Sequence, residues 1–303
     1  MPANLSFGCP TVASKQGYRS IVHRNSSRNY WATVRKSYTG RRPRLVVLPQ
    51  ERLINGCRTR MLTRCQGTVT REVLTRSQRS KLDQGSDRQF YDAPRLVTHV
   101  DDTFLRKVTQ LYRQRIPEEA AVLDLMSSWV SHLPTERRYS KVIGHGMNAA
   151  ELARNKRLDS FFVRDLNVEP DGWALPERSF DAVLCCVSVQ YLQQPERVFA
   201  EIYRVLKPGG VCIVTFSNRL YYNKAIQAWR DNSGFGRVQL VKQYFLCVEG
   251  FTEPQALHDV DLSGEPAPQG FAAVLQNAQR LFQRVQGDPF YAVISYRNYK
   301  RVD

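Results

Sequence analysis

The sequence lacks several features that would assign it to a familiar class. None of its seven cysteines is spaced C-x-x-C, so we expect no zinc or other metal site, no disulfide framework and a reducing compartment. Cys185 and Cys212 lie in apolar, strand-like runs, where a thiol usually packs as a small hydrophobic group. No apolar run approaches the ~20 residues needed to span a bilayer, and no internal repeat is visible.

Acidic residues are scarce at the start of the chain. Residues 1–80 hold 16 of the 44 Lys and Arg residues but only two acids, Glu51 and Glu72. The remainder has 28 basic and 26 acidic residues, so the net charge of +16 says little about what the later part binds. An Arg- and Ser-rich leader that has few acids and no secretory hydrophobic stretch is typical of an organelle transit peptide.

We therefore predict that residues 1–85 are a basic, disordered leader that the organelle import machinery recognises. The chloroplast is favoured over the mitochondrion as the destination. The alternative is a basic arm that binds RNA or anionic lipid. It is less favoured because dense basic clusters are lacking, apart from residues 41–44.

From about Phe90 onward, short apolar runs alternate with amphipathic stretches. The helical part begins with Asp101 or Asp102 capping a helix over about 103–115, and continues with a helix that Asn148 caps with Glu151 as its reciprocal partner. Further helices are expected from Pro195 and near residues 224–230, 238–247 and 271–285, and Lys207–Gly210 is expected to form a tight turn. Strands are predicted at 121–125, 141–146, 161–165, 180–187, 211–216, 254–260 and 290–296.

This alternation favours a parallel sheet with helices on both faces. The two late strands, joined by a longer excursion, are expected to add an antiparallel edge. The run Ala121–Leu125 is the centre of this prediction, since it reads as a buried strand that carries Asp124 to its carboxyl end. In open α/β sheets the ligand crevice lies at that end of the strands.

The sequence and order of these segments resemble those of class I S-adenosylmethionine-dependent methyltransferases, especially the small-molecule type 11 group. The resemblance covers about Phe90–Asn298 and is strongest from Ser179–Leu184 through Tyr191-Leu192 and Pro195–Leu206 to Leu206–Gly210. It implies a Rossmann-like, mostly parallel seven-stranded sheet with an antiparallel edge strand, in a domain over 90–298. It also implies S-adenosylmethionine as cofactor and methyl transfer as the activity.

The resemblance places specific residues at the cofactor. Asp124 matches the acid after the first strand, and Asp165 matches the acid that accepts a hydrogen bond from the adenine amino group, with Leu166 donating from its backbone. The full set of predicted cofactor-binding residues is Asp124, Ser127, Ser128, Gly146, Met147, Asp165 and Leu166. The alternative for Asp165 is a loop cap within Asp165–Asn167.

Two departures from the family stand out. The glycine positions of the first loop hold Met126, Ser128 and Val130. The acid that grips both ribose hydroxyls is replaced by Gly146. His145 or Asn148 is left to hydrogen-bond the ribose, although neither reproduces a bidentate carboxylate. Either the serines hold the cofactor in an altered geometry, or the chain is a non-catalytic scaffold that has lost the cofactor.

The acceptor is expected to be a small molecule, uncharged or apolar, because the residues after the fourth strand supply polarity without charge. His132 and Tyr191 are the candidate general bases, ahead of His99 and Tyr91. The alternatives are a loop histidine bonded to backbone and tyrosines that only pack. An RNA methyltransferase is disfavoured by the near-neutral later part, and Met126–Ser128 excludes the G-x-G-x-x-G turn of a dehydrogenase.

Overall fold

The computed structural model describes residues 67–258 and 287–298, together with the backbone of two short strands, β1 (Ala32–Arg35) and β2 (Arg44–Val47). β1 and β2 pair antiparallel. The helix predicted near 271–285 and nearly all of the predicted leader before Gly67 lie outside the described residues. In the part that is described, no helix is both long and apolar enough to cross a membrane.

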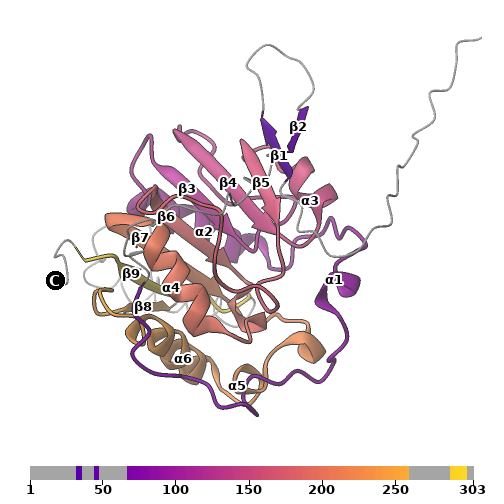
Figure 1. Cartoon of the computed structure of the whole chain (residues 1–303), viewed down its shortest axis with the longest axis vertical. Helices are drawn as coiled ribbons and strands as arrows, with labels where there is room; N and C mark the ends of the chain where they lie inside the picture. Colours follow the sequence, from indigo (N-terminus) through magenta and orange to yellow (C-terminus); the bar gives the residue numbers. More distant parts are fainter. Residues whose placement is uncertain (1–31, 36–43, 48–66, 259–286, 299–303) are drawn as a thin grey trace, which may run out of the picture. The chain divides into compact units, whose positions relative to one another are not determined.

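The main body alternates strands and helices in the predicted manner (Figure 1). Its strands are β3 (Ala121–Leu125), β4 (Lys141–Gly146), β5 (Ser160–Val163), β6 (Phe180–Cys186), β7 (Leu206–Phe216), β8 (Gln255–His258) and β9 (Tyr291–Tyr296). Its helices are α1 (Asp87–Phe90), α2 (Asp102–Arg115), α3 (Ala149–Arg154), α4 (Pro195–Val205), α5 (Gln227–Arg230) and α6 (Gly234–Leu246).

The seven strands form one sheet in the order β5-β4-β3-β6-β7-β9-β8. β3, β4, β5, β6 and β7 are mutually parallel, and β9 is antiparallel to both of its neighbours. The predicted fold class is therefore confirmed, and the antiparallel strand lies one position in from the β8 edge. The strand order reverses between β3 and β6, which is the point where such sheets bind ligands.

Helices cover both faces of the sheet, because alternate residues of each strand point to opposite sides (Figure 1). On β7, Cys212 and Val214 pack in the core shared with α4 and α6, whereas Val211 and Ile213 pack in the core shared with α2. The buried face of α2 consists of Phe104, Val108, Leu111 and Tyr112. Asp101 is the N-cap of this helix and accepts a hydrogen bond from the Phe104 amide at 2.7 Å.

Two local predictions are wrong. The boundary near residue 85 is too late, because the chain is already packed from Gly67: Leu74 is 2% exposed, and the Arg79 guanidinium lies 2.8 Å from the Glu196 carboxylate. This segment has no helical or strand period, so contacts distant in sequence hold it in place. Lys207–Gly210 is not a turn between helix and strand but the irregular start of β7, with Gly209 at φ +77°.

Candidate functional site

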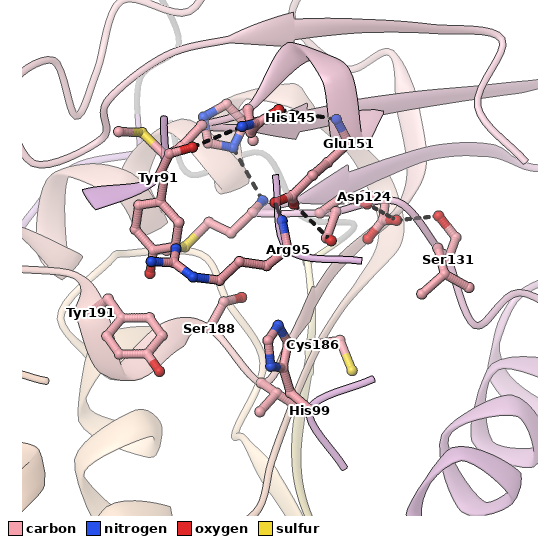
Figure 2. A pocket seen from close by; sticks show the side chains of 18 of the residues that line it. Tyr91, Arg95, His99, Asp124, Ser131, His145, Glu151, Cys186, Ser188 and Tyr191 are labelled. Atoms are coloured by element: carbon pink, nitrogen blue, oxygen red, sulfur yellow. Dashed lines mark hydrogen bonds between the residues drawn. The ribbon is translucent and has the colours of Figure 1, made fainter. Parts of the chain in front are cut away.

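A cavity of about 330 Å³ lies at the carboxyl ends of β3, β4, β5 and β6. Residues from the segments 87–100 and 219–221 complete its wall (Figure 2). All nine residues predicted for cofactor binding or catalysis line it: Asp124, Ser127, Ser128, His132, Gly146, Met147, Asp165, Leu166 and Tyr191. The strand pattern therefore brings the candidate residues to one place, although their individual roles rest on further argument.

The carboxylate of Asp124 organises the loop after β3. It is 6% exposed and accepts hydrogen bonds from the hydroxyls of Ser127, at 2.6 Å, and Ser131. Burial raises the pKa of Asp124, and the two hydroxyl donors oppose that rise. Serine side chains here hold a loop that is usually shaped by glycine.

The same loop takes the left-handed backbone conformation at Met126, which has φ +55°. A residue with a side chain is strained in this region. The Met126 amide donates to His145 Nδ1 at 3.1 Å, and the Ser127 amide donates to the His145 carbonyl at 2.6 Å. These bonds to β4 stabilise the strained conformation.

His145 is consequently a structural residue rather than a ribose ligand. Its Nδ1 accepts from Met126, so its Nε2 carries the proton and donates to the Arg164 carbonyl at 2.9 Å. Burial lowers the pKa of His145 to about 4, so the ring is neutral at physiological pH. Of the two alternatives for a ribose hydrogen bond, His145 is therefore disfavoured, because both of its ring nitrogens are already bonded within the protein.

Gly146 has no side chain because the first loop occupies the space. A Cβ atom there would lie 2.5 Å from the Ser127 carbonyl oxygen, well inside contact distance. The two departures from the family pattern are thus linked, since the acid is absent where the backbone of the serine loop approaches.

Asn148 and Glu151 hydrogen-bond to the segment before α2, and Glu151 also bonds to the loop after β3. Asn148 caps α3, as predicted, and its Nδ2 donates to the carbonyl of Tyr91 at 2.8 Å. Glu151 does not return a capping bond. Its carboxylate instead accepts from the Arg95 amide at 2.6 Å and from the Ser128 hydroxyl at 2.9 Å. The reciprocal cap was wrong because both carboxylate oxygens bind groups distant in sequence.

The loop after β5 is fixed in a similar way. Asp165 Oδ1 accepts from the Asn167 amide at 2.9 Å, so the predicted loop cap is present. Asn167 Nδ2 donates to Asp87 at 2.8 Å and to the Tyr191 carbonyl at 3.0 Å. The buried Asp87 carboxylate also pairs with Lys81 and Lys224, which anchors the segment around α1 to this loop.

The two candidate bases differ in their surroundings. Tyr191 Oη accepts from the Tyr221 amide at 2.8 Å, and burial raises the pKa of Tyr191 to about 12, so it stays protonated. Burial lowers the pKa of His132 to about 4, and within the described residues no hydrogen bond to its ring is present. The alternative of a histidine bonded to the local backbone is therefore not what the described structure shows.

Cys186 also lines the cavity, where burial raises the pKa of its thiol to about 12. A thiol of that pKa is not a nucleophile at neutral pH, which supports the packing interpretation. Its neighbour Val187 has φ +51°, a strained conformation for a β-branched residue, and its amide donates to the Thr215 carbonyl at 2.7 Å.

Over the described ranges, no cluster of three His, Cys, Asp or Glu residues suits a metal ion.

Sequence reasoning missed Arg95, Tyr221 and Asp87, which line the cavity from irregular or short segments. None lies in a periodic stretch or at the end of a predicted strand. The run Phe90–Pro94 was recognised as the start of order, but nothing in it indicated that the chain folds back over the strand ends.

Residues 128–214 match the family model described as a methyltransferase domain. The matched range contains most of the cavity-lining residues and the strongest part of the resemblance seen in the sequence, which this match confirms. A search of curated proteins found no match to the chain.

Several solved structures are similar in outline. An S-adenosylmethionine-dependent methyltransferase from Mesorhizobium loti is 16% identical, with 62% of this chain and 96% of that chain covered and a TM-score of 0.39. Phosphoethanolamine N-methyltransferase 2 of Haemonchus contortus, solved with phosphomonomethylethanolamine and S-adenosylhomocysteine, is 14% identical over 64% of this chain and 53% of that chain, with a TM-score of 0.41. Similarity at this level carries no information about the substrate of this chain.

Proposed function

We propose that this chain, whose residues 128–214 match a methyltransferase-domain model, transfers a methyl group from S-adenosylmethionine to a small-molecule acceptor. The observation that carries the proposal is a cavity at the strand ends that is lined largely by residues of the matched range and gathers every predicted cofactor residue. We propose further that the domain extends over 67–298.

The residues around the cavity fit the cofactor in part. Asp124 and the Met126–Ser131 loop would support the methionine end, Gly146 and Met147 the ribose, and Asp165 with Leu166 the adenine. The ribose acid is absent and cannot be restored at Gly146 without a clash with Ser127. The hydroxyl protons of Ser127 and Ser128 point to Asp124 and Glu151, which leaves the serine oxygens free to accept hydrogen bonds from a ligand.

S-adenosylmethionine supplies, when bound, a methyl group on a positively charged sulfur. The chain's own residues hold the acceptor in line with that group and exclude water. His132 is the residue in position to take a proton from an acceptor. A pKa of about 4 makes it a weak base, which suits an acceptor that is already a good nucleophile.

The leader remains a separate proposal. The acid-poor residues before Gly67 would direct the protein to the chloroplast, or alternatively to the mitochondrion. Fusing residues 1–66 to a fluorescent protein and imaging it in a plant cell tests this. A diffuse cytosolic signal would contradict it.

Methyl transfer is tested with S-adenosylmethionine labelled in its methyl group. The full chain is incubated with the small-molecule fraction of a cell extract and, separately, with its RNA fraction. We expect label in the small-molecule fraction and its loss in Asp124→Asn, whereas Asp92→Asn, at an exposed position, keeps it. Label in RNA would favour an RNA methyltransferase, and label in neither fraction would favour a scaffold.

A further inference from the structure

One cation at the cavity has no partner for its charge. The guanidinium of Arg95 lies over the ring of Phe90, with Cζ 4.2 Å from the ring centre, and within 5.7 Å and 5.4 Å of the ring centres of Tyr91 and Tyr221. Its Nη1 is buried and has no hydrogen-bond partner in the described part of the chain. Figure 2 shows the side chain extending between Tyr91 and Ser188, with no dashed line from its guanidinium.

The acids that line the cavity do not neutralise it. Asp124 is bonded to two serines, Asp87 to two lysines and Asn167, and Glu151 to Ser128 and the Arg95 amide. The fourth acid, Asp165, accepts from the Asn167 amide. None of them forms an ion pair with the Arg95 guanidinium among the described residues. The aromatic faces stabilise its positive charge but leave its N–H groups unbonded.

A buried N–H group without an acceptor is costly, and the cost is removed when a ligand supplies the acceptor. Two parallel N–H groups of a guanidinium match two oxygens of a carboxylate or of a phosphate group, and a carboxylate is the one that carries a single negative charge. Two other arginines line the cavity and both are already bonded: Arg219 donates to Asp288 at 2.6 Å, and Arg164 donates to the Glu169 carbonyl at 2.8 Å. One open guanidinium therefore matches a ligand with one negative charge.

The position of the guanidinium decides which ligand carries that charge. The predicted cofactor residues lie at the ends of β3, β4 and β5, whereas Tyr221 and Tyr191, which pack together at 6.2 Å, follow β7 and β6. Arg95 reaches Tyr221, so its charge lies over the half of the cavity left to the acceptor. Aromatic side chains form the wall around it.

We propose that Arg95 binds a carboxylate of the acceptor, and that the acceptor is an organic acid with an apolar or aromatic body. This inference rests on the proposed function and replaces the expectation of an uncharged acceptor. That expectation considered only residues after the fourth strand and therefore did not include Arg95.

The test is a ligand-observed NMR titration of the full chain with benzoate and with benzamide, its neutral isostere. We expect benzoate to bind at least tenfold more tightly than benzamide, and Arg95→Gln to remove that preference. Arg88→Gln is the matched control, since Arg88 is exposed, lies outside the cavity lining and loses the same charge. Equal affinity for the two probes, or a preference that survives Arg95→Gln, overturns the proposal.

A second arm separates the acceptor from the cofactor. S-adenosylhomocysteine, which has a carboxylate, and adenosine, which has none, are titrated by calorimetry into wild type and Arg95→Gln. We expect both affinities to stay within twofold. A tenfold loss for S-adenosylhomocysteine alone would mean that Arg95 holds the cofactor's carboxylate, which overturns the acceptor assignment. Failure of wild type to bind S-adenosylhomocysteine, with benzoate still preferred, would instead reject the proposed function.

Discussion

The two halves of the cavity use their polar groups differently. At the ends of β3, β4 and β5, Asp124, His145 and Glu151 are bonded to one another's loops and leave few free donors (Figure 2). In the other half, where Tyr221 and Tyr191 pack together, the buried Nη1 of Arg95 has no hydrogen-bond partner within the described chain. The first half is preorganised by the protein, and the second leaves its polar groups available to a ligand.

The largest expected effect is on the preorganised half, through His145. Because folding lowers the pKa of His145 from its ordinary value near 6.5 to about 4, the unfolded chain takes up a proton in this window and the folded chain does not. The stability that the neutral ring contributes is complete above pH 6.5 and is lost as the pH falls toward 4. The loss amounts to roughly 3 kcal/mol, at about 1.4 kcal/mol per pKa unit.

Urea unfolding of wild type and His145→Gln at several pH values measures this. We expect the variant to be less stable at pH 7.5 and the gap to narrow as the pH falls to 4.5. Other titrating groups are common to both proteins and cancel in the difference. A gap that is constant with pH would show that His145 is not held neutral.

The next effect concerns Gly146. Gly146→Ala places a Cβ 2.5 Å from the Ser127 carbonyl, so the serine loop must move, and we expect a loss of about 2 kcal/mol in the free energy of unfolding. Gly85→Ala is the control, because its Cβ would meet only the carboxylate end of a side chain, that of Asp83, and no backbone atom. Equal stability of the two variants would remove the packing explanation for the missing acid.

A smaller effect is expected at Asp124. Asp124→Asn keeps the shape of the side chain but weakens the bonds from the Ser127 and Ser131 hydroxyls. We expect about tenfold weaker S-adenosylhomocysteine binding, or about 1.4 kcal/mol, since charge-assisted hydrogen bonds are stronger than neutral ones. Calorimetry against Asp92→Asn measures it, and unchanged affinity in both would contradict the role of Asp124.

The smallest effect belongs to the ligand-facing half. Tyr191→Phe removes the acceptor of the Tyr221 amide, and we expect a loss of about 1 kcal/mol in stability. The rate of methyl transfer at saturating acceptor should stay within threefold, because the Tyr191 hydroxyl remains protonated and is not the base. A hundredfold loss of kcat in a folded variant would assign catalysis to Tyr191 and not to His132.

The sequence was sufficient to predict the sheet, its helices and the place where its strand ends meet. Hydrophobic periodicity and apolar runs specify such elements. Asp124, Gly146 and Asp165 were predicted as site residues because they lie at the ends of predicted strands. It was insufficient to predict that Arg95 lines the cavity and that Glu151 accepts a hydrogen bond from the Arg95 amide. Those contacts join segments about 56 residues apart in sequence, and no local pattern encodes a contact of that range.

The order of the packed segment from Gly67 to Asp87 was not predicted, for the same reason. Leu74 and Lys81 have no periodic neighbours, so only the tertiary contacts with Glu196, Asp87 and Lys224 reveal that they are ordered. The presence of Met126 at a glycine position of the family was recognisable as unusual, but its left-handed conformation was not predicted. That it is held by His145 required the structure.

The central claim is that a loop of serines, fixed by Asp124 and packed on Gly146, still holds an adenosyl ligand. Calorimetric titration of the full-length wild type with S-adenosylhomocysteine tests it most directly. The account predicts saturable binding with one ligand per chain and a dissociation constant in the micromolar range, about −8 kcal/mol. Absence of heat and of any shift in unfolding temperature at millimolar ligand would contradict it.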